Sequence, residues 1–414
     1  MMKVGIVTTW FERGAAYVSK QFKEALEKSG YQVFIYSRGG EDLTEVKGLE
    51  WRGNEVYEGK KVHFPESTYI DLNDFECWLL DNNIDTVLFN EQRWLPPVLL
   101  CKKIGIRSGA YIDYYTKETV SSFKFYDFLI CNTKRHQSVF DWHEQCFFIP
   151  WGTDTSLFSG KERVESNILR FFTSVGMNPD RKGLDLTVKA YIDFIGDRDL
   201  QSKLIIHSQL DVSQFLKARL TESEYFKYSE LVNSNDISVK IETVTAPGLY
   251  HIGDIYVYPS RLEGIGLTIA EALSSGMPAI VPDEAPMNEY LCPNSFAVEV
   301  ERRFKRYDGY YWESNEVSVK SLSKSFSRYY DIKTKIVKMQ NETREYSVEN
   351  LTWNDRVPDI AKAFETSKIM SGDISDWRSY NNKFNKHFPY LSQLQIIYKA
   401  IWFFARSRFF SALR

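Results

Sequence analysis

The sequence predicts an α/β protein with two domains, each built on a mostly parallel sheet. Its 414 residues are too many for one ordinary domain and suit two of moderate size, each able to bury its own core. Short apolar runs alternate with amphipathic segments in both halves, which is typical of strands buried on both faces by helices. A stretch rich in charge, Pro and Gly near residue 155 separates the two halves and predicts the domain boundary.

The first half begins with a strand at residues 4–8, an amphipathic helix at 16–28 and a second strand at 32–37. Together they predict a βαβ unit of the kind that builds parallel sheets. The later elements expected in this half are a helix at 76–82 and strands at 86–89, 109–112 and 128–132. We assign residues 1–155 to this N-terminal domain.

The second half repeats this organisation after the run FFIPWGTDTSLF and the charged segment KERVESN. The elements expected here are strands at 169–175, 203–207, 237–242, 255–259 and 279–281, with helices at 183–194 and 267–274. Residues 156–365 are therefore predicted to form a C-terminal domain, and residues 366–414 an extension. Ligands are expected at the carboxyl ends of the strands and across the cleft between the domains.

The composition is that of a soluble globular protein, with 43% apolar and 26% charged residues, and the net charge of -3 argues against a nucleic-acid partner. The five cysteines are widely spaced without a CxxC pair, which fits reduced thiols in a cytoplasmic protein. The six histidines form no ligand cluster, so no metal or cofactor is predicted and none of them is given a catalytic role. The start MMKVGIVTTW fits a first buried strand rather than a signal peptide, and no apolar run is long enough to span a bilayer.

The run RLEGIGLTIAEALSSGMPAIVP, at residues 261–282, places a glycine-containing turn between an apolar strand and a helix. Gly264 and Gly266 let the backbone approach a ligand closely, and the free amides at the start of the helix form an anion site. Glu263 lies beside this site and Glu271 about one helical turn beyond it. The spacing therefore predicts a phosphate between two carboxylates that hold two sets of sugar hydroxyls; by themselves, the carboxylates also fit ordinary loop and helix-surface positions.

This segment resembles the E-x7-E region of family 4 of the retaining glycosyltransferases, which have the GT-B fold. IPWGTDTSLF resembles the family's interdomain stretch, SVGMNPDRKGLDLTVKA its "VGR…KG" segment, and ENLTWNDRVPDIAKAF its closing helix. The likeness covers about residues 1–364, tightly in the C-terminal domain and loosely in the N-terminal one. It implies two Rossmann-like α/β domains facing across a cleft, with a C-terminal helical extension that packs on the N-terminal domain.

The resemblance implies a nucleotide-sugar site in the C-terminal domain. Glu263 would hold hydroxyls of the donor sugar, and Glu271 would bind the ribose hydroxyls. The backbone amides of Ile265, Gly266 and Leu267 would bind the diphosphate.

Other expected site residues lie outside this turn. Lys182, with Arg181 beside it, would neutralise the charge that builds on the leaving diphosphate, although the pair also fits a solvated helix start. Gly14, in the loop FERGAA, would let the N-terminal domain approach the phosphates or the acceptor. Two positions depart from the family pattern: Met177 stands where an arginine often follows the glycine of "VGR", and Asp113 stands where a histidine is common. Arg181 is expected to compensate for Met177.

Asp113, in the run GAYIDYY, can accept a hydrogen bond from the donor sugar or the acceptor, or serve as a turn or cap residue. We group it with Glu263, Lys182 and Arg181 as the predicted catalytic set. Residues 90–93 follow a predicted strand, so they either contribute to the acceptor site or form a polar loop.

The expected function is retaining transfer of a sugar from a nucleotide diphosphate sugar to a lipid-linked or polysaccharide acceptor, in bacterial cell-surface glycan synthesis and without a metal. A nucleotide-sugar epimerase and an inactive GT-B partner of another transferase remain alternatives. A glycosidase is disfavoured because both carboxylates come from one strand-turn-helix unit. A nicotinamide dehydrogenase is disfavoured because GxGxxG is missing after the first strand.

The C-terminal tail is basic and aromatic, with no acidic residue after Asp376. Such a segment can lie in a membrane interface, with cations on anionic lipid and rings at headgroup depth. It can equally pack back on the N-terminal domain. The first possibility predicts a cytoplasmic protein that is peripheral on the inner face of the cell membrane.

Overall fold

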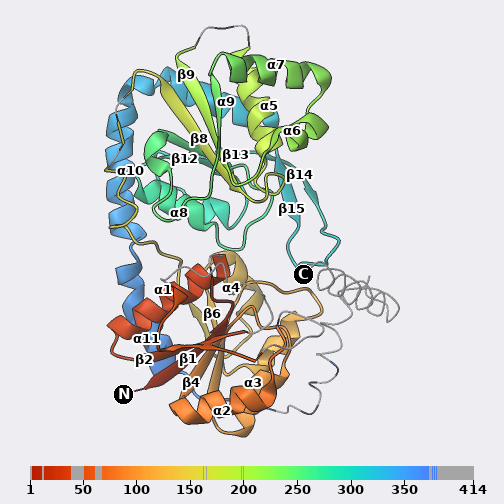
Figure 1. Ribbon diagram of the computed structural model, residues 1–414, viewed down its shortest axis with the longest axis vertical. Helices are drawn as coiled ribbons and strands as arrows, with labels where there is room; N and C mark the ends of the chain where they lie inside the picture. The colour runs from red at the N-terminus through yellow and green to blue at the C-terminus, as the bar shows by residue number, and fades with distance from the viewer. Residues whose placement is uncertain are drawn as a thin grey trace, which may run out of the picture.

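A computed structural model shows two α/β domains, one above the other along the longest axis of the molecule (Figure 1). It describes residues 2–11, 14–38, 51–60, 68–161, 163–164, 166–196, 198, 200–372, 375, 377 and 379. Each domain is built around a parallel sheet, one of seven strands and one of six. The two parallel-sheet domains predicted from the sequence are confirmed.

The N-terminal sheet has the strand order β3-β2-β1-β4-β5-β6-β7. Its strands are β1 (Lys3–Thr8), β2 (Gln32–Ser37), β3 (Val56–Glu58), β4 (Thr86–Asn90), β5 (Arg107–Tyr111), β6 (Phe128–Cys131) and β7 (Cys146–Phe148). Its helices are α1 (Gly14–Lys28), α2 (Leu72–Asn82), α3 (Pro96–Lys103) and α4 (Lys134–Phe140). The apolar strand β4 is buried at every position, as expected for a parallel strand covered on both faces.

The C-terminal sheet has the strand order β10-β9-β8-β11-β12-β13. Its strands are β8 (Leu169–Gly176), β9 (Ser202–Ser208), β10 (Ile237–Ile241), β11 (Ile255–Val257), β12 (Ala279–Pro282) and β13 (Phe296–Val298). The strand order reverses between β8 and β11, so the loops that follow these two strands lie side by side. That is where ligands bind in open parallel sheets.

Helices cover the C-terminal sheet and then carry the chain back to the N-terminal domain. They are α5 (Leu184–Ile195), α6 (Ser213–Arg219), α7 (Glu222–Asn233), α8 (Leu267–Ser274), α9 (Val319–Asp331), α10 (Ile336–Asn350) and α11 (Val357–Thr366). Helix α11 packs against α1, and the indole of Trp353 just before it donates to the Gln21 carbonyl at 3.0 Å. The segment up to residue 365, assigned to the C-terminal domain from the sequence, thus ends with a helix that lies on the N-terminal domain.

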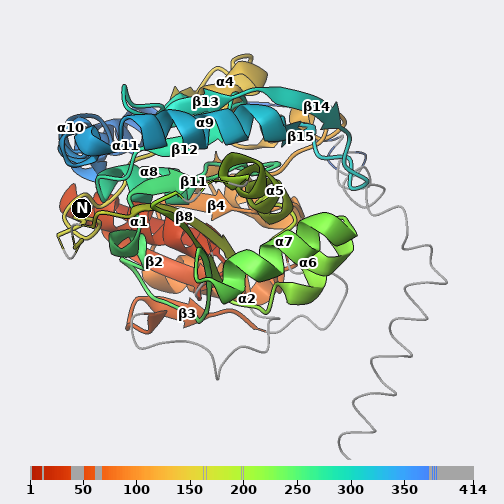
Figure 2. The same cartoon turned by 90° about the horizontal axis from the view of Figure 1, so that it is seen from above.

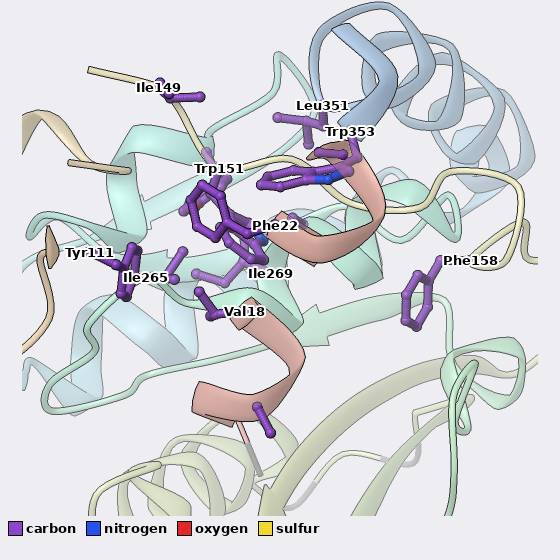
Figure 3. Close-up of a cluster of buried hydrophobic side chains, with 14 of the residues drawn as sticks. Val18, Phe22, Tyr111, Ile149, Trp151, Phe158, Ile265, Ile269, Leu351 and Trp353 are labelled. Atoms are coloured by element: carbon purple, nitrogen blue, oxygen red, sulfur yellow. The ribbon is translucent and has the colours of Figure 1, made fainter. Parts of the chain in front are cut away.

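An apolar cluster joins the two domains (Figure 3). Phe22 of α1 packs edge-on against Trp353, with the ring centroids 5.9 Å apart. The ring centroid of Trp151, in the linker after β7, lies 4.7 Å from that of Trp353. Ile265 and Ile269 bring the glycine turn and α8 into this cluster. The turn is therefore anchored by apolar contacts to the other domain.

An antiparallel hairpin, β14 (Val300–Phe304) and β15 (Ser314–Val317), follows the last strand of the C-terminal sheet. It lies at the edge opposite α10 in both views (Figures 1 and 2). The residues that connect its strands reach the N-terminal domain, where the Tyr311 amide donates to the Tyr115 carbonyl at 2.9 Å. The Tyr114 hydroxyl donates to the Asp308 carbonyl at 3.0 Å. The two domains are thus connected at both edges.

The tail after residue 379 lies outside the described residues, so its proposed membrane contact stays a prediction. In the described part of the chain, no helix has both the length and the apolar character that a membrane span requires.

Candidate active site

The glycine turn joins β11 to α8 at the point where the sheet order reverses. Gly266 is the residue before α8 and has φ of 86°, a left-handed conformation that favours glycine. In the described part of the chain, the amides of Ile265, Gly266 and Leu267 donate to no protein acceptor. The structure therefore offers the three predicted diphosphate donors together at the start of α8.

Glu263 forms the centre of a buried charged cluster. Its side chain is nearly inaccessible, and Oε1 accepts from Arg181 at 2.5 Å and from Lys182 at 2.9 Å. Ser260 donates to the same oxygen at 2.6 Å. Burial alone would raise the pKa of Glu263, but the two cations hold it below its ordinary value. Glu263 is therefore a fixed anion between two fixed cations.

The second carboxylate oxygen of Glu263 is left for another donor. All the protein hydrogen bonds to this carboxylate in the described residues go to Oε1. A carboxylate has acceptor capacity on both oxygens. Oε2 is thus available to a hydroxyl group, as the predicted contact to a donor sugar requires.

Lys182, in the loop between β8 and α5, is held in place by its neighbours. Its ammonium donates to the Tyr258 hydroxyl and lies 4.5 Å from the centroid of that ring. Burial lowers the pKa of Lys182 to about 8, and the attraction of Glu263 opposes this shift. The next residue is Gly183, with φ of 67°, and a Cβ there would lie 2.2 Å from the Pro259 carbonyl oxygen. Only glycine lets this loop lie so close to the end of β11.

Glu271 lies on α8 and faces a cavity of about 530 Å³. Its Oε2 accepts from the Tyr250 hydroxyl at 2.5 Å, and burial raises the pKa of Glu271. Ser174 and His207, from β8 and β9, lie on the same cavity wall, where Ser174 Oγ and His207 Nδ1 are 3.0 Å apart. Residues 244–250 complete that wall. The cavity brings polar groups and a carboxylate together in a space of the size that small-molecule sites have.

The N-terminal domain contributes Gly14 to the opposite wall of this cavity. A Cβ on Gly14 would lie 4.0 Å from Leu267 Cδ1, so the start of α1 faces the start of α8. Gly14 thus lies near the glycine turn, and its approach to the phosphates or the acceptor stays a prediction. Residues 12–13 of the same loop are outside the described residues.

Asp113 and Glu91 follow the neighbouring strands β5 and β4, and the Asp113 carbonyl accepts from the Tyr310 hydroxyl of the C-terminal domain at 3.1 Å. Burial and the negative charge of Glu91 raise the pKa of Asp113 to about 7. Glu91 has φ of 55°, which is strained for a residue other than glycine. Backbone strain of this kind is common at functional sites. Arg93 lies over the Tyr114 ring at 4.3 Å and weakens the rise in the Asp113 pKa. The structure thus brings Asp113 together with residues 90–93.

Arg261 is a site residue that the sequence did not reveal. Its buried guanidinium donates hydrogen bonds to both carboxylate oxygens of Asp185 on α5, at 2.9 and 2.7 Å. It also donates to Glu316 of β15 at 2.8 Å. Arg261 therefore fixes the glycine turn to α5 and to the hairpin. Tyr250, Tyr258 and His136 were also missed, because tyrosine and histidine are common core residues and their partners are distant in sequence.

Met177 is largely exposed at the end of β8, so the position where the family often has an arginine supplies no cation here. Arg181 is instead directed at Glu263 and also donates to the Leu262 carbonyl at 3.0 Å. Among the described residues, no group of three or more His, Cys, Asp or Glu side chains is arranged to hold a metal ion. A metal-independent site stays a prediction.

Residues 161–347 match the family model described as "Glycosyl transferases group 1", a segment that contains Lys182, Glu263 and Glu271. This part of the chain is thus a glycosyltransferase group 1 domain. No curated protein matches the chain.

Solved structures share the fold over most of the chain at low sequence identity. A glycosyltransferase from Rickettsia africae ESF-5 has a TM-score of 0.68 at 15% identity, covering 88% of this chain and 99% of that one. HepE of Anabaena, in complex with UDP and glucose, has a TM-score of 0.63 at 12% identity over 88% and 100% of the two chains. The lipopolysaccharide outer core galactosyltransferase WaaB has a TM-score of 0.59 at 11% identity over 88% and 99%. These likenesses confirm the predicted GT-B fold.

Proposed function

We propose that the protein is a retaining glycosyltransferase of the family 4 type, which transfers a sugar from a nucleoside diphosphate sugar to an acceptor. The observation that carries this proposal is the buried Lys182–Glu263–Arg181 cluster beside the unpartnered amides that begin α8. The adjoining cavity has room for a nucleoside against Glu271. HepE, which shares the fold, binds UDP and glucose, and this supports a nucleotide-sugar donor.

In the proposed reaction, the amides of residues 265–267 and the Lys182 ammonium hold the diphosphate and balance the charge that develops as it leaves. Oε2 of Glu263 accepts from a hydroxyl of the donor sugar and orients the ring. The acceptor hydroxyl attacks the face that the phosphate leaves, and an oxygen of the leaving phosphate takes its proton. The protein contributes positioning and charge stabilisation, with Lys182 and Arg181 supplying the positive charge and no metal required.

The acceptor is proposed to lie against the N-terminal edge of the cleft, beside Asp113 and Glu91. We propose a lipid-linked or polysaccharide acceptor and a role in cell-surface glycan synthesis at the inner face of the bacterial membrane. The shared fold with WaaB, a lipopolysaccharide galactosyltransferase, supports this class. The basic, aromatic tail supplies the proposed membrane contact.

The test is a turnover assay on the full chain with a panel of nucleotide sugars, each with and without membrane-lipid and glycan acceptors. We expect release of the nucleoside diphosphate to depend on acceptor, and NMR of the product to show the anomeric configuration of the donor retained. Donor consumption that needs no acceptor and yields an isomeric nucleotide sugar would identify an epimerase. No turnover in any combination would favour an inactive partner.

A further inference from the structure

A chain of hydrogen bonds begins and ends in the C-terminal domain but passes through the N-terminal domain. Trp312, in the connection between β14 and β15, donates from Nε1 to the Tyr115 hydroxyl at 2.7 Å. Tyr115, just after β5, lies 2.8 Å from Nδ1 of His136 on α4. Nε2 of His136 lies 3.2 Å from the carbonyl oxygen of Gly264 in the glycine turn. The hairpin and the turn are thus linked through two side chains of the other domain.

The chemistry of the groups fixes the direction of every proton in this chain. The Gly264 carbonyl only accepts, so Nε2 of His136 carries a hydrogen. The Trp312 indole only donates, so the Tyr115 oxygen accepts from it and directs its own hydrogen to Nδ1 of His136. The imidazole is neutral, because burial lowers the pKa of His136 to about 3. Each polar atom in the chain is therefore satisfied in one arrangement.

The bond to Gly264 acts on the peptide group that supplies the first diphosphate donor. The Gly264 carbonyl and the Ile265 amide belong to one planar trans peptide, in which C=O and N–H point in opposite directions. A donor on the carbonyl side fixes the plane and polarises the N–H on the other side. His136 thus holds the carbonyl end of the peptide whose amide is available to an anion.

Further contacts with the C-terminal domain fix the position of α4 relative to the glycine turn. The Glu289 carboxylate, from the C-terminal domain, accepts from the amides of Lys134 and Arg135 at 2.7 and 3.0 Å. The Arg135 guanidinium lies 4.4 Å from the centroid of the Trp312 ring and contacts the Ala285 carbonyl. The N-terminal turn of α4, directly before His136, is therefore held by contacts from the C-terminal domain.

We propose that His136 is a positioning residue for the diphosphate-binding turn, and that Tyr115 and Trp312 set its tautomer, so that docking of the hairpin helps to order the donor site in the opposite domain. The effect on turnover rests on the proposed function, whereas the effect on the order of the turn does not.

The first experiment measures amide hydrogen exchange of the turn in the full chain without ligand, in wild type and two neighbouring variants. Tyr115→Phe removes the hydroxyl that belongs to the chain, and Tyr114→Phe removes a hydroxyl that bonds the same hairpin but not His136. We expect exchange in a peptide spanning residues 262–270 to rise about fivefold in Tyr115→Phe and to stay near wild type in Tyr114→Phe. Equal exchange in all three proteins, or an equal rise in both variants, would overturn the proposal.

The second experiment asks whether the donated hydrogen is what matters. His136→Gln keeps an N–H donor on a side chain of similar reach, and His136→Leu removes it. We expect Leu to raise exchange in the turn more than Gln does, and Tyr115→Phe to add little to His136→Leu because the link is already broken. Full additivity of the two substitutions, or identical exchange in Gln and Leu, would contradict the proposal.

Turnover provides a further arm once a donor has been found. We expect His136→Leu and Tyr115→Phe to lower kcat/KM for the donor by roughly tenfold, with partial recovery in His136→Gln and little change in Tyr114→Phe. A wild type that turns over no nucleotide sugar would end the proposed function, while the exchange measurements still decide the role of His136. Turnover losses without any change in exchange would reject the positioning role.

Discussion

The two edges of the cleft carry charge in different ways. At the C-terminal edge, Glu263 is a buried anion paired with Arg181 and Lys182, and the cations hold the carboxyl pKa low. At the N-terminal edge, burial and the like charge of the nearby Glu91 raise the pKa of Asp113 to about 7. Glu263 thus stays ionised through the neutral range, whereas Asp113 changes its charge near pH 7.

This difference implies that donor and acceptor steps respond differently to pH. The proposed diphosphate site needs positive charge, which Lys182 and Arg181 would supply, and Glu263 and Tyr258 hold these two cations in place. The proposed acceptor is a neutral hydroxyl, and Asp113 accepts a hydrogen bond from it more strongly when ionised than when protonated. The following predictions test this contrast, from the largest expected effect to the smallest.

The largest loss is expected for Glu263→Gln. The amide keeps the size of the side chain but leaves Lys182 and Arg181 without their counter-charge and weakens the acceptor for the donor sugar. We expect turnover to fall by roughly 100- to 1000-fold. The matched control is Glu230→Gln on α7, where a half-exposed carboxylate pairs with Lys227 at 3.3 Å and turnover should not change. Wild-type turnover in Glu263→Gln would show that Glu263 takes no part in the reaction.

The alkaline side of the pH profile should report on Lys182. Its pKa is lowered to about 8, so the ammonium is charged below that pH and loses its proton above it. We expect kcat/KM for the donor to fall by about tenfold per pH unit once the pH exceeds 8. Lys182→Arg keeps a cation at every pH, so its profile should be flat there even though its turnover is lower. The same alkaline fall in both proteins would assign it to another group.

The acid side should report on Asp113. Because its pKa is raised to about 7, the carboxylate forms only as the pH rises through 7, and kcat should rise with it. Asp113→Asn should lower turnover at pH 8 by about fivefold and abolish this rise. An unchanged acid limb in Asp113→Asn would exclude Asp113 from the acceptor step.

Ionisation of Asp113 should have the opposite effect on stability: it raises turnover but lowers the free energy of unfolding. A raised folded-state pKa means that stability is lost as the pH rises from the ordinary carboxyl range to about 7, because over this range the unfolded chain ionises and the buried carboxyl does not. Asp113→Asn stays neutral, so we expect it to unfold at a higher temperature than wild type at pH 8. The gap should shrink as the pH falls through 7. A variant less stable than wild type at pH 8 would contradict the burial argument.

The smallest effect is expected for Tyr250→Phe. Its hydroxyl donates to Glu271 and orients that carboxylate, while the other proposed contacts to the nucleotide remain. We expect the Kd of the nucleoside diphosphate, measured by calorimetry, to rise about threefold. Tyr191→Phe is the control, because it loses a hydroxyl bond to Ser202 within the same domain at 3.2 Å and away from the cavity. Equal weakening in both would mean that Tyr250 acts through general stability.

Much of the fold was predictable because its signals are local. Strand β2 and helix α8 have the predicted ends, and the other expected elements lie within a few residues of their predicted bounds. The glycine turn was predictable for the same reason: its carboxylates, glycines and helix start lie within about nine residues of each other, at fixed helical spacing. The hairpin was not predicted, because residues 300–317 alternate charges and aromatics without a clear period.

The parts of the site that were missed depend on contacts between distant segments. His136 and Gly264 are separated by 128 residues, and Arg261 and Asp185 by 76. Nothing local distinguishes such residues from satisfied core groups. The closeness of Asp113 and Glu91 was only partly predictable from the sequence. Both residues were expected after strands, but they lie close together because β4 and β5 are neighbours in the sheet.

The most direct test of the central claim is a thermal-unfolding screen of wild type and Glu271→Ala against UDP, GDP, ADP, CDP and dTDP, alone and as sugars. A ligand at about 100 times its Kd should add roughly 2.7 kcal/mol to the free energy of unfolding. We predict that nucleotides of one base stabilise the wild type and stabilise Glu271→Ala much less. If no nucleotide stabilises the wild type, or if both proteins respond equally, the carboxylates around the glycine turn do not form a nucleotide-sugar site.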